Sequence, residues 1–187
     1  RSVINIDKNT KHFAGFAAMV GRPNVGKSTL TNSLIGEKIA IMSDRPQTTR
    51  NKIMCILNTD NAQIMFLDTP GIHKPQHKLG QFMVRQAEGT LQEVDVVLFV
   101  VDATEKRGAG EEYILELLRK VKTPVILVVN KIDKLEDKQK LFKIIEDYSK
   151  QYKFAAIVPV SALKDTEFPG LVEEITKHLP EGPAYFP

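Results

Sequence analysis

The stretch Gly21-Arg22-Pro23-Asn24-Val25-Gly26-Lys27-Ser28 follows an apolar run, residues 13–20, and opens a segment of helical period, residues 27–35. A glycine-rich loop between a strand and a helix is typical of phosphate binding. Its glycines let backbone N–H groups approach the phosphates, and the helix N-terminus adds a positive dipole. We therefore predict that Lys27 reaches the β- and γ-phosphates of a nucleotide and that Ser28 ligates Mg²⁺. Thr29, the next residue, is also expected to contact the nucleotide.

The remaining chain alternates apolar runs with segments of helical period. Residues 96–101 and 125–129 are apolar throughout, so they must be covered on both faces, as in a parallel sheet between helix layers. A turn at residues 58–61 joins two further runs as a hairpin. The predicted fold is α/β: a mostly parallel six-stranded sheet with one antiparallel hairpin strand and helices on both faces. We expect strands at 13–20, 53–57, 64–67, 96–101, 125–129 and 155–160, and helices at 27–35, 79–92, 111–120, 137–152 and 168–178.

Composition and charge narrow the class of protein. With 187 residues, 42% of them hydrophobic and 26% charged, the chain suits one globular domain and excludes the disordered and fibrous classes. A net charge of +3 permits contact with nucleic acid without requiring it. The longest apolar run, 94–101, is far shorter than the roughly 20 residues of a membrane-spanning helix, so no transmembrane segment is expected. The single cysteine, Cys55, is predicted to be a buried apolar side chain on a strand, which fits a reducing compartment.

Parallel sheets bind ligands at the carboxyl ends of their strands, so the functional residues are expected in the loops that follow the strands. Asp68-Thr69-Pro70-Gly71 ends one strand, where the Asp68 carboxylate could hold magnesium through water and the Gly71 N–H could meet a γ-phosphate. The loop of residues 43–50 carries two adjacent hydroxyls, and one of them should ligate magnesium in the triphosphate state. We favour Thr49 over Thr48, with the loop reporting the nucleotide state to a partner.

Two further strand ends predict the choice of base. In Asn130-Lys131-Ile132-Asp133, the Asp133 carboxylate can accept hydrogen bonds from both the N1 and the exocyclic amino group of guanine, a pair of donors that adenine lacks. Asn130 and Lys131 would brace the loops and cover the base. Ser161-Ala162-Leu163 ends the last strand, where small residues would let the Ala162 N–H approach the guanine O6. The predicted ligands are therefore GTP and GDP.

These motifs, in this order, resemble the translation-factor-related GTPases. The loop Pro46-Gln47-Thr48-Thr49-Arg50-Asn51-Lys52, with Asp68-Thr69-Pro70-Gly71-Ile72-His73, resembles the bacterial Era GTPases, and the resemblance extends over residues 13–187. It implies a cytoplasmic assembly factor of the small ribosomal subunit that hydrolyses GTP and binds 16S rRNA through a KH domain. No Gly-x-x-Gly loop follows Phe168, so the RNA function is not assigned to these residues. Peripheral association with the inner membrane face is a further expectation.

The resemblance also predicts a division of the chain into three parts. Residues 1–12 are expected to form an extension outside the fold, residues 13–180 the GTPase domain, and residues 181–187 a tail leading to a KH domain absent from this sequence. An MnmE- or Der-like GTPase is an alternative that shares the Thr-Thr-Arg loop, but Gln47 stands where those proteins usually carry glycine. A guanine-nucleotide switch without catalysis is a second alternative, against which the intact Lys27, Ser28, Thr49 and Asp68 argue.

Water activation is the remaining question, because Ile72 follows Gly71 where Ras-like enzymes carry a water-orienting glutamine. Ile72 cannot orient water, so the domain must either hydrolyse GTP slowly or gain the water positioning and the positive charge from elsewhere. In relatives that resemble this chain, an asparagine at the position of Asn24 helps to bind a potassium ion; a loop-bracing role is the alternative. The predicted catalytic residues are Lys27, Thr49, Gly71 and Asn24, and the predicted metal ligands are Ser28, Thr49 and Asp68. The predicted nucleotide contacts are Gly21, Arg22, Pro23, Asn24, Val25, Gly26, Lys27, Ser28, Thr29, Asp68, Thr69, Pro70, Gly71, Ile72, Asn130, Lys131, Asp133, Ser161, Ala162 and Leu163.

Overall fold

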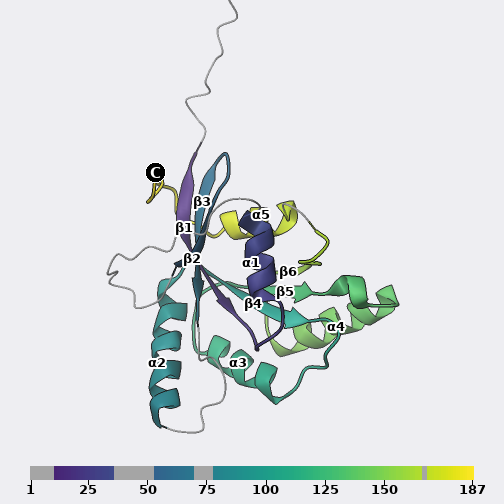
Figure 1. Ribbon diagram of the computed structural model, residues 1–187. Coiled ribbons are helices and arrows are strands. Elements are labelled where there is room, and N and C mark those ends of the chain that lie inside the picture. The colour runs from purple at the N-terminus through teal and green to yellow at the C-terminus, as the bar shows by residue number, and fades with distance from the viewer. Residues whose placement is uncertain (1–10, 36–52, 70–77, 166–167) are drawn as a thin grey trace, which may run out of the picture.

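The computed structural model describes residues 11–35, 53–69, 78–165 and 168–187. Its centre is a six-stranded sheet of order β2-β3-β1-β4-β5-β6, in which β2 runs antiparallel to β3 and the other neighbours are parallel (Figure 1). The predicted α/β class is therefore confirmed. The strands are β1 (Phe13–Val20), β2 (Ile53–Asn58), β3 (Ala62–Asp68), β4 (Val96–Asp102), β5 (Val125–Asn130) and β6 (Ala156–Pro159).

Helices cover both faces of the sheet. Side chains of α2, α3 and α4 pack on one face, and those of α1 and α5 pack on the other. Each predicted boundary of these helices and of the strands lies within two residues of the observed one. The helices are α1 (Lys27–Ile35), α2 (Lys78–Glu93), α3 (Ala109–Arg119), α4 (Lys138–Gln151) and α5 (Pro169–Thr176), with a short 3₁₀ helix, η1 (Ile132–Lys134), after β5.

Strand β4 illustrates why the central strands are apolar at every position. Val97, Phe99 and Val101 belong to the core under α2, α3 and α4. Val96, Leu98 and Val100 belong to the core under α1 and α5. Because side chains alternate between the faces of a strand, a sheet covered on both sides must be apolar on both.

The register of the strands brings the predicted motifs to one edge of the sheet. Met19 of β1 pairs with Asp68 of β3, so the phosphate loop begins beside the end of β3. Asp102 of β4 pairs with Asn130 of β5, which places the next two strand ends at the same edge. In the described part of the chain, no helix is both long and apolar enough to cross a membrane.

The C-terminal tail, residues 180–187, lies against β1 and β3. The backbone N–H of Ala14 donates to the Pro180 carbonyl at 3.1 Å, and the Gly182 N–H donates to the His12 carbonyl at 2.9 Å. Gln63 of β3 is fully buried and accepts hydrogen bonds at Oε1 from the N–H groups of Tyr185 (2.7 Å) and Phe186 (3.0 Å). Its Nε2 donates to the Phe186 carbonyl at 2.9 Å. The tail is thus attached at the amino end of β3, the end opposite Asp68.

Candidate nucleotide-binding site

The phosphate loop makes a tight turn between β1 and α1. Gly21 is in close contact with β4, because a Cβ there would lie 2.6 Å from the Val100 carbonyl oxygen. Asn24 (φ 67°) and Gly26 (φ 97°) adopt left-handed backbone conformations. Lys27 Nζ donates to the Gly21 carbonyl at 3.0 Å, so this side chain folds back over the loop. The loop therefore has the shape needed to present backbone N–H groups to an anion.

The Lys27 ammonium lies in a partly desolvated place. Burial lowers the pKa of Lys27, and the nearby Asp68 carboxylate opposes that shift. A partly buried cation that has no ion-pair partner within 4 Å among the described residues favours binding of an anion such as phosphate. The side chain that sequence analysis assigned to the phosphates is thus placed for that role.

Ser28 and Asp68 are the described members of the predicted magnesium set. Ser28 is exposed in the first turn of α1, and Asp68 ends β3, next to β1. A hydroxyl and a carboxylate are hard oxygen ligands, and Mg²⁺ commonly takes one or two protein ligands, with phosphate and water oxygens completing its shell. Ser28 and Asp68 therefore fit Mg²⁺. Among the described residues, no group of three or more His, Cys, Asp or Glu side chains could hold a metal ion. The buried hydroxyl of Thr69 donates to the Met19 carbonyl at 2.8 Å and braces β3 on β1.

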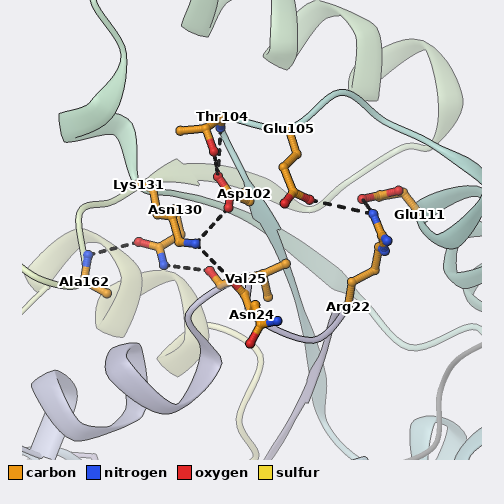
Figure 2. A network of polar contacts seen from close by, with 10 residues as sticks. All are labelled: Arg22, Asn24, Val25, Asp102, Thr104, Glu105, Glu111, Asn130, Lys131 and Ala162. Atoms are coloured by element: carbon orange, nitrogen blue, oxygen red, sulfur yellow. Dashed lines mark hydrogen bonds and ion pairs between the residues drawn. The ribbon is translucent and has the colours of Figure 1, made fainter.

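Asn130 joins three loops. Its Nδ2 donates to the Val25 carbonyl of the phosphate loop at 2.9 Å, and its Oδ1 accepts from the Ala162 N–H at 3.0 Å (Figure 2). The side chain is buried, and a Cβ at Gly26 would lie only 2.3 Å from its Nδ2. The predicted bracing role of Asn130 is therefore seen directly, in contacts that hold the loops predicted to bind the base against the phosphate loop.

Lys131 makes a second link to the phosphate loop. Its Nζ donates to the Asn24 carbonyl at 2.8 Å and to Asp102 Oδ2 at 2.8 Å. Burial alone would raise the pKa of Asp102, but the hydrogen bonds from Lys131 and Thr104 hold it below its usual value. Asp102 was not among the predicted site residues. The available signal was a carboxylate that ends an otherwise apolar strand at the ligand-binding edge.

Asp133 and the last strand end meet at the predicted base site. The Ser161 hydroxyl donates to Asp133 Oδ1 at 2.6 Å, and this bond holds the pKa of Asp133 below its usual value. The Ser161 N–H donates to Asp165 Oδ2 at 2.7 Å, and the Ser33 hydroxyl of α1 donates to the Ala162 carbonyl at 2.6 Å. A charged carboxylate of this kind only accepts hydrogen bonds, as recognition of the guanine N1 and amino groups requires.

Arg22 ties the phosphate loop to α3. Its guanidinium lies 3.3 Å from Glu111 and 3.7 Å from Glu105 (Figure 2). Glu111 is almost fully buried and also accepts from the Gly108 N–H at 2.9 Å at the start of α3. Arg22 thus points toward α3, and its described contacts anchor the loop to the fold.

The structure gathers most of the predicted residues at one edge of the sheet, although Leu163 is 73% exposed at its rim. Pro23 is exposed in the phosphate loop, and Thr29 lies in the first turn of α1. The predicted residues Thr48, Thr49, Pro70, Gly71 and Ile72 lie outside the described residues.

A family model described as 50S ribosome-binding GTPase matches residues 16–131. The chain belongs to this GTPase family. The matched residues include the phosphate loop, β3 with Asp68, and Asn130 with Lys131. The predicted membership of the GTPases is therefore confirmed.

The predicted resemblance of this GTPase to Era is also confirmed. GTPase Era of Clostridioides difficile is 57% identical over 174 residues, which are 93% of this chain and 59% of that relative. A variant of Aquifex aeolicus Era bound to GDP and AlF₄⁻ superposes with a TM-score of 0.76 at 44% identity, covering 94% of this chain and 60% of that one. An Era structure in complex with MgGDPNP and nucleotides 1506–1542 of 16S ribosomal RNA gives a TM-score of 0.79 at 44% identity, with the same coverage. The chain thus spans about three fifths of the length of these relatives.

Proposed function

We propose that this chain is the GTP-binding and GTP-hydrolysing domain of an Era-like assembly factor of the small ribosomal subunit. One observation carries the proposal: Asn130 bonds the phosphate loop at Val25 and the last strand end at Ala162. A phosphate-binding loop and a guanine-binding loop are thereby held as one site. The Era relative solved with a GTP analogue and 16S rRNA supports the same assignment.

Recognition of GTP divides between the two ends of the site. Lys27 and the backbone of residues 21–28 would hold the phosphates, and Asp133 would accept from the guanine base. Ser161 orients the Asp133 carboxylate through the 2.6 Å hydrogen bond from its hydroxyl. An adenine base offers no matching pair of donors and would leave that carboxylate without partners on the base, so selectivity for guanine follows.

Magnesium would be held by Ser28, Asp68 and Thr49, and when bound it neutralises charge that develops on the β- and γ-phosphates. Lys27 would add a second positive charge there, and the Gly71 N–H would meet the γ-phosphate. Asn24 would contribute to a potassium site beside the phosphates, in place of an arginine finger. These roles for Thr49, Gly71 and Asn24 rest on the motifs in the sequence.

The remaining assignments extend to a longer protein. Residues 13–180 would form the GTPase domain, and residues 181–187 would lead to a KH domain that binds 16S rRNA. We place that protein in the cytoplasm, with a peripheral association at the inner membrane face. The isolated chain should then bind GTP and GDP but show little specific affinity for ribosomal RNA.

Single-turnover hydrolysis tests the enzymatic part. GTP should be converted to GDP and phosphate, ATP should not, and EDTA should stop the reaction. Lys27→Ala should remove the activity, whereas Lys138→Ala, an exposed lysine on α4, should retain it. Equal turnover of ATP and GTP, or an active Lys27→Ala variant, would overturn the assignment. An RNA pull-down with the longer protein tests the second part: capture of tRNA in place of 16S rRNA would favour the MnmE-like alternative.

A further inference from the structure

We propose that Asp102 is a positioning residue for nucleotide binding, which holds Lys131 so that the guanine-binding loop and the phosphate loop stay in register. The inference rests on the proposed guanine-nucleotide function and adds to that site a residue from the end of a fifth strand, β4.

The Asp102 side chain is only 4% exposed at the end of β4, and both of its oxygens have partners. Oδ2 accepts from Lys131 Nζ at 2.8 Å. Oδ1 accepts from the Thr104 N–H at 2.8 Å and from the Thr104 hydroxyl at 2.6 Å. A buried carboxylate with this set of donors has one stable position, because any rotation would leave a charge unpaired in a poorly solvated place. Asp102 is therefore a fixed point to which Lys131 is tied.

The residues on the other side of this link are conformationally unusual. Lys131 (φ 65°) and Asn24 (φ 67°) both have left-handed backbones, and in the described part of the chain Phe168 is the single other non-glycine residue with positive φ. Such conformations persist where surrounding contacts over-determine them. The contact shared by these two residues is Lys131 Nζ, which donates to the Asn24 carbonyl at 2.8 Å while paired with Asp102. The ion pair thus lies where the two strained loops meet (Figure 2).

Aspartate suits this position for a chemical reason. Three donors from Lys131 and Thr104 require a side chain with two acceptor oxygens. Asparagine offers a single acceptor oxygen, so either the Lys131 ammonium or Thr104 would face an amide N–H₂ group. The Lys131 side chain is 25% exposed and could then turn toward water, which would release the Asn24 carbonyl.

The test measures GDP affinity and dissociation in a double-mutant cycle of Asp102→Asn and Lys131→Met. Asp102→Asn alone should weaken GDP binding by about 10- to 100-fold, the range for a lost charge-assisted hydrogen bond, mainly through faster dissociation. In the Lys131→Met background the same change should add less than about 2-fold, since the partner is already gone. Glu116→Gln, an exposed acid on α3, is the matched control and should leave affinity unchanged.

A second readout separates positioning from base reading. Inosine diphosphate lacks the exocyclic amino group that Asp133 would accept from, so the ratio of GDP to inosine diphosphate affinity reports on Asp133. Asp102→Asn should weaken both ligands equally and leave that ratio unchanged. If Asp102→Asn does not fold, Asp102→Glu replaces it, because one extra methylene displaces the carboxylate while keeping its charge; GDP release should again quicken only when Lys131 is present.

Unchanged GDP release, equal losses with and without Lys131, or a changed ratio between the two nucleotides would each overturn the role of Asp102. Failure of the proposed function would look different. In that case the unsubstituted chain would bind GDP no more tightly than ADP, regardless of the GDP affinities of the variants.

Discussion

A Cβ atom at Gly26 would lie 2.3 Å from the Nδ2 of Asn130, so the phosphate loop can pack against the guanine-binding loop only because residue 26 is glycine. The left-handed backbone of Gly26 (φ 97°) is a second requirement for glycine at the same position. The close packing of the phosphate loop against Asn130 therefore depends on the absence of a side chain at residue 26.

Gly26→Ala should separate these halves. A side chain there must displace Asn130 and adopt a strained backbone at a cost of about 1–3 kcal/mol, so GDP affinity should fall by roughly 5- to 150-fold in a fluorescence titration. Gly89→Ala is the matched control, because Gly89 is exposed in α2 with no atom within 4 Å of an added Cβ. It should raise stability by about 0.5–1 kcal/mol and leave affinity unchanged. Tight GDP binding by Gly26→Ala would contradict the fit.

Asp133→Asn should shift preference from guanine to xanthine nucleotides. The asparagine amide donates where the carboxylate accepted, and xanthine presents a carbonyl in place of the guanine amino group. Ser161 can still donate to the retained oxygen, so the loop should keep its shape. Titrations with GDP and xanthosine diphosphate measure the shift, with Asp137→Asn at the N-cap of α4 as control. No gain for the xanthine nucleotide would refute this reading of Asp133.

Potassium should accelerate GTP hydrolysis relative to sodium at equal ionic strength. The motivating residue is Asn24, whose side chain is exposed in the phosphate loop while its carbonyl is held by Lys131. Asn24→Ala should abolish the difference between the salts and spare GDP binding. Asn24→Gly should do the same without backbone strain at φ 67°. Equal rates of the unsubstituted chain in the two chlorides would exclude the potassium site.

Gln63→Met should release the C-terminal tail from β3. The substitution removes both acceptor and donor groups, so the N–H groups of Tyr185 and Phe186 lose their partner. Hydrogen exchange at these two amides should accelerate by about 10-fold or more, while exchange in β1 changes little. Gln139→Met, an exposed position on α4, serves as control. Unaltered exchange at both tail amides would mean that other contacts hold the tail.

Cys55 should resist alkylation in the folded protein. Its side chain is fully buried on β2, as predicted, and burial raises the pKa of the thiol to about 12. The reactive thiolate is therefore scarce at pH 8, and the sulfur is inaccessible as well. Iodoacetamide at pH 8 should label the chain only after denaturant unfolds it, as mass spectrometry would detect. Rapid labelling of the native chain would contradict this burial.

The fold class, the element boundaries and the strand-end motifs could all be predicted from the sequence. These are local properties: apolar runs such as residues 125–129 identify buried strands, and the glycines and Lys27 of the phosphate loop lie within one short segment. Because ligands bind at the carboxyl ends of parallel strands, the sequence also predicts that Asn130, Asp133 and Ala162 lie in one site.

The distant partners of Asp102, Arg22 and Gln63 could not be predicted from the sequence. Asp102 bonds a residue 29 positions away, Arg22 one 89 positions away, and Gln63 one 122 positions away. In the sequence each is an ordinary polar residue in or beside a strand, with nothing nearby to indicate its partner. Buried polar groups need hydrogen-bond partners, and strand order and register decide which donors and acceptors lie close enough to pair. Strand order and register depend on the packing of the whole sheet and not on the local sequence.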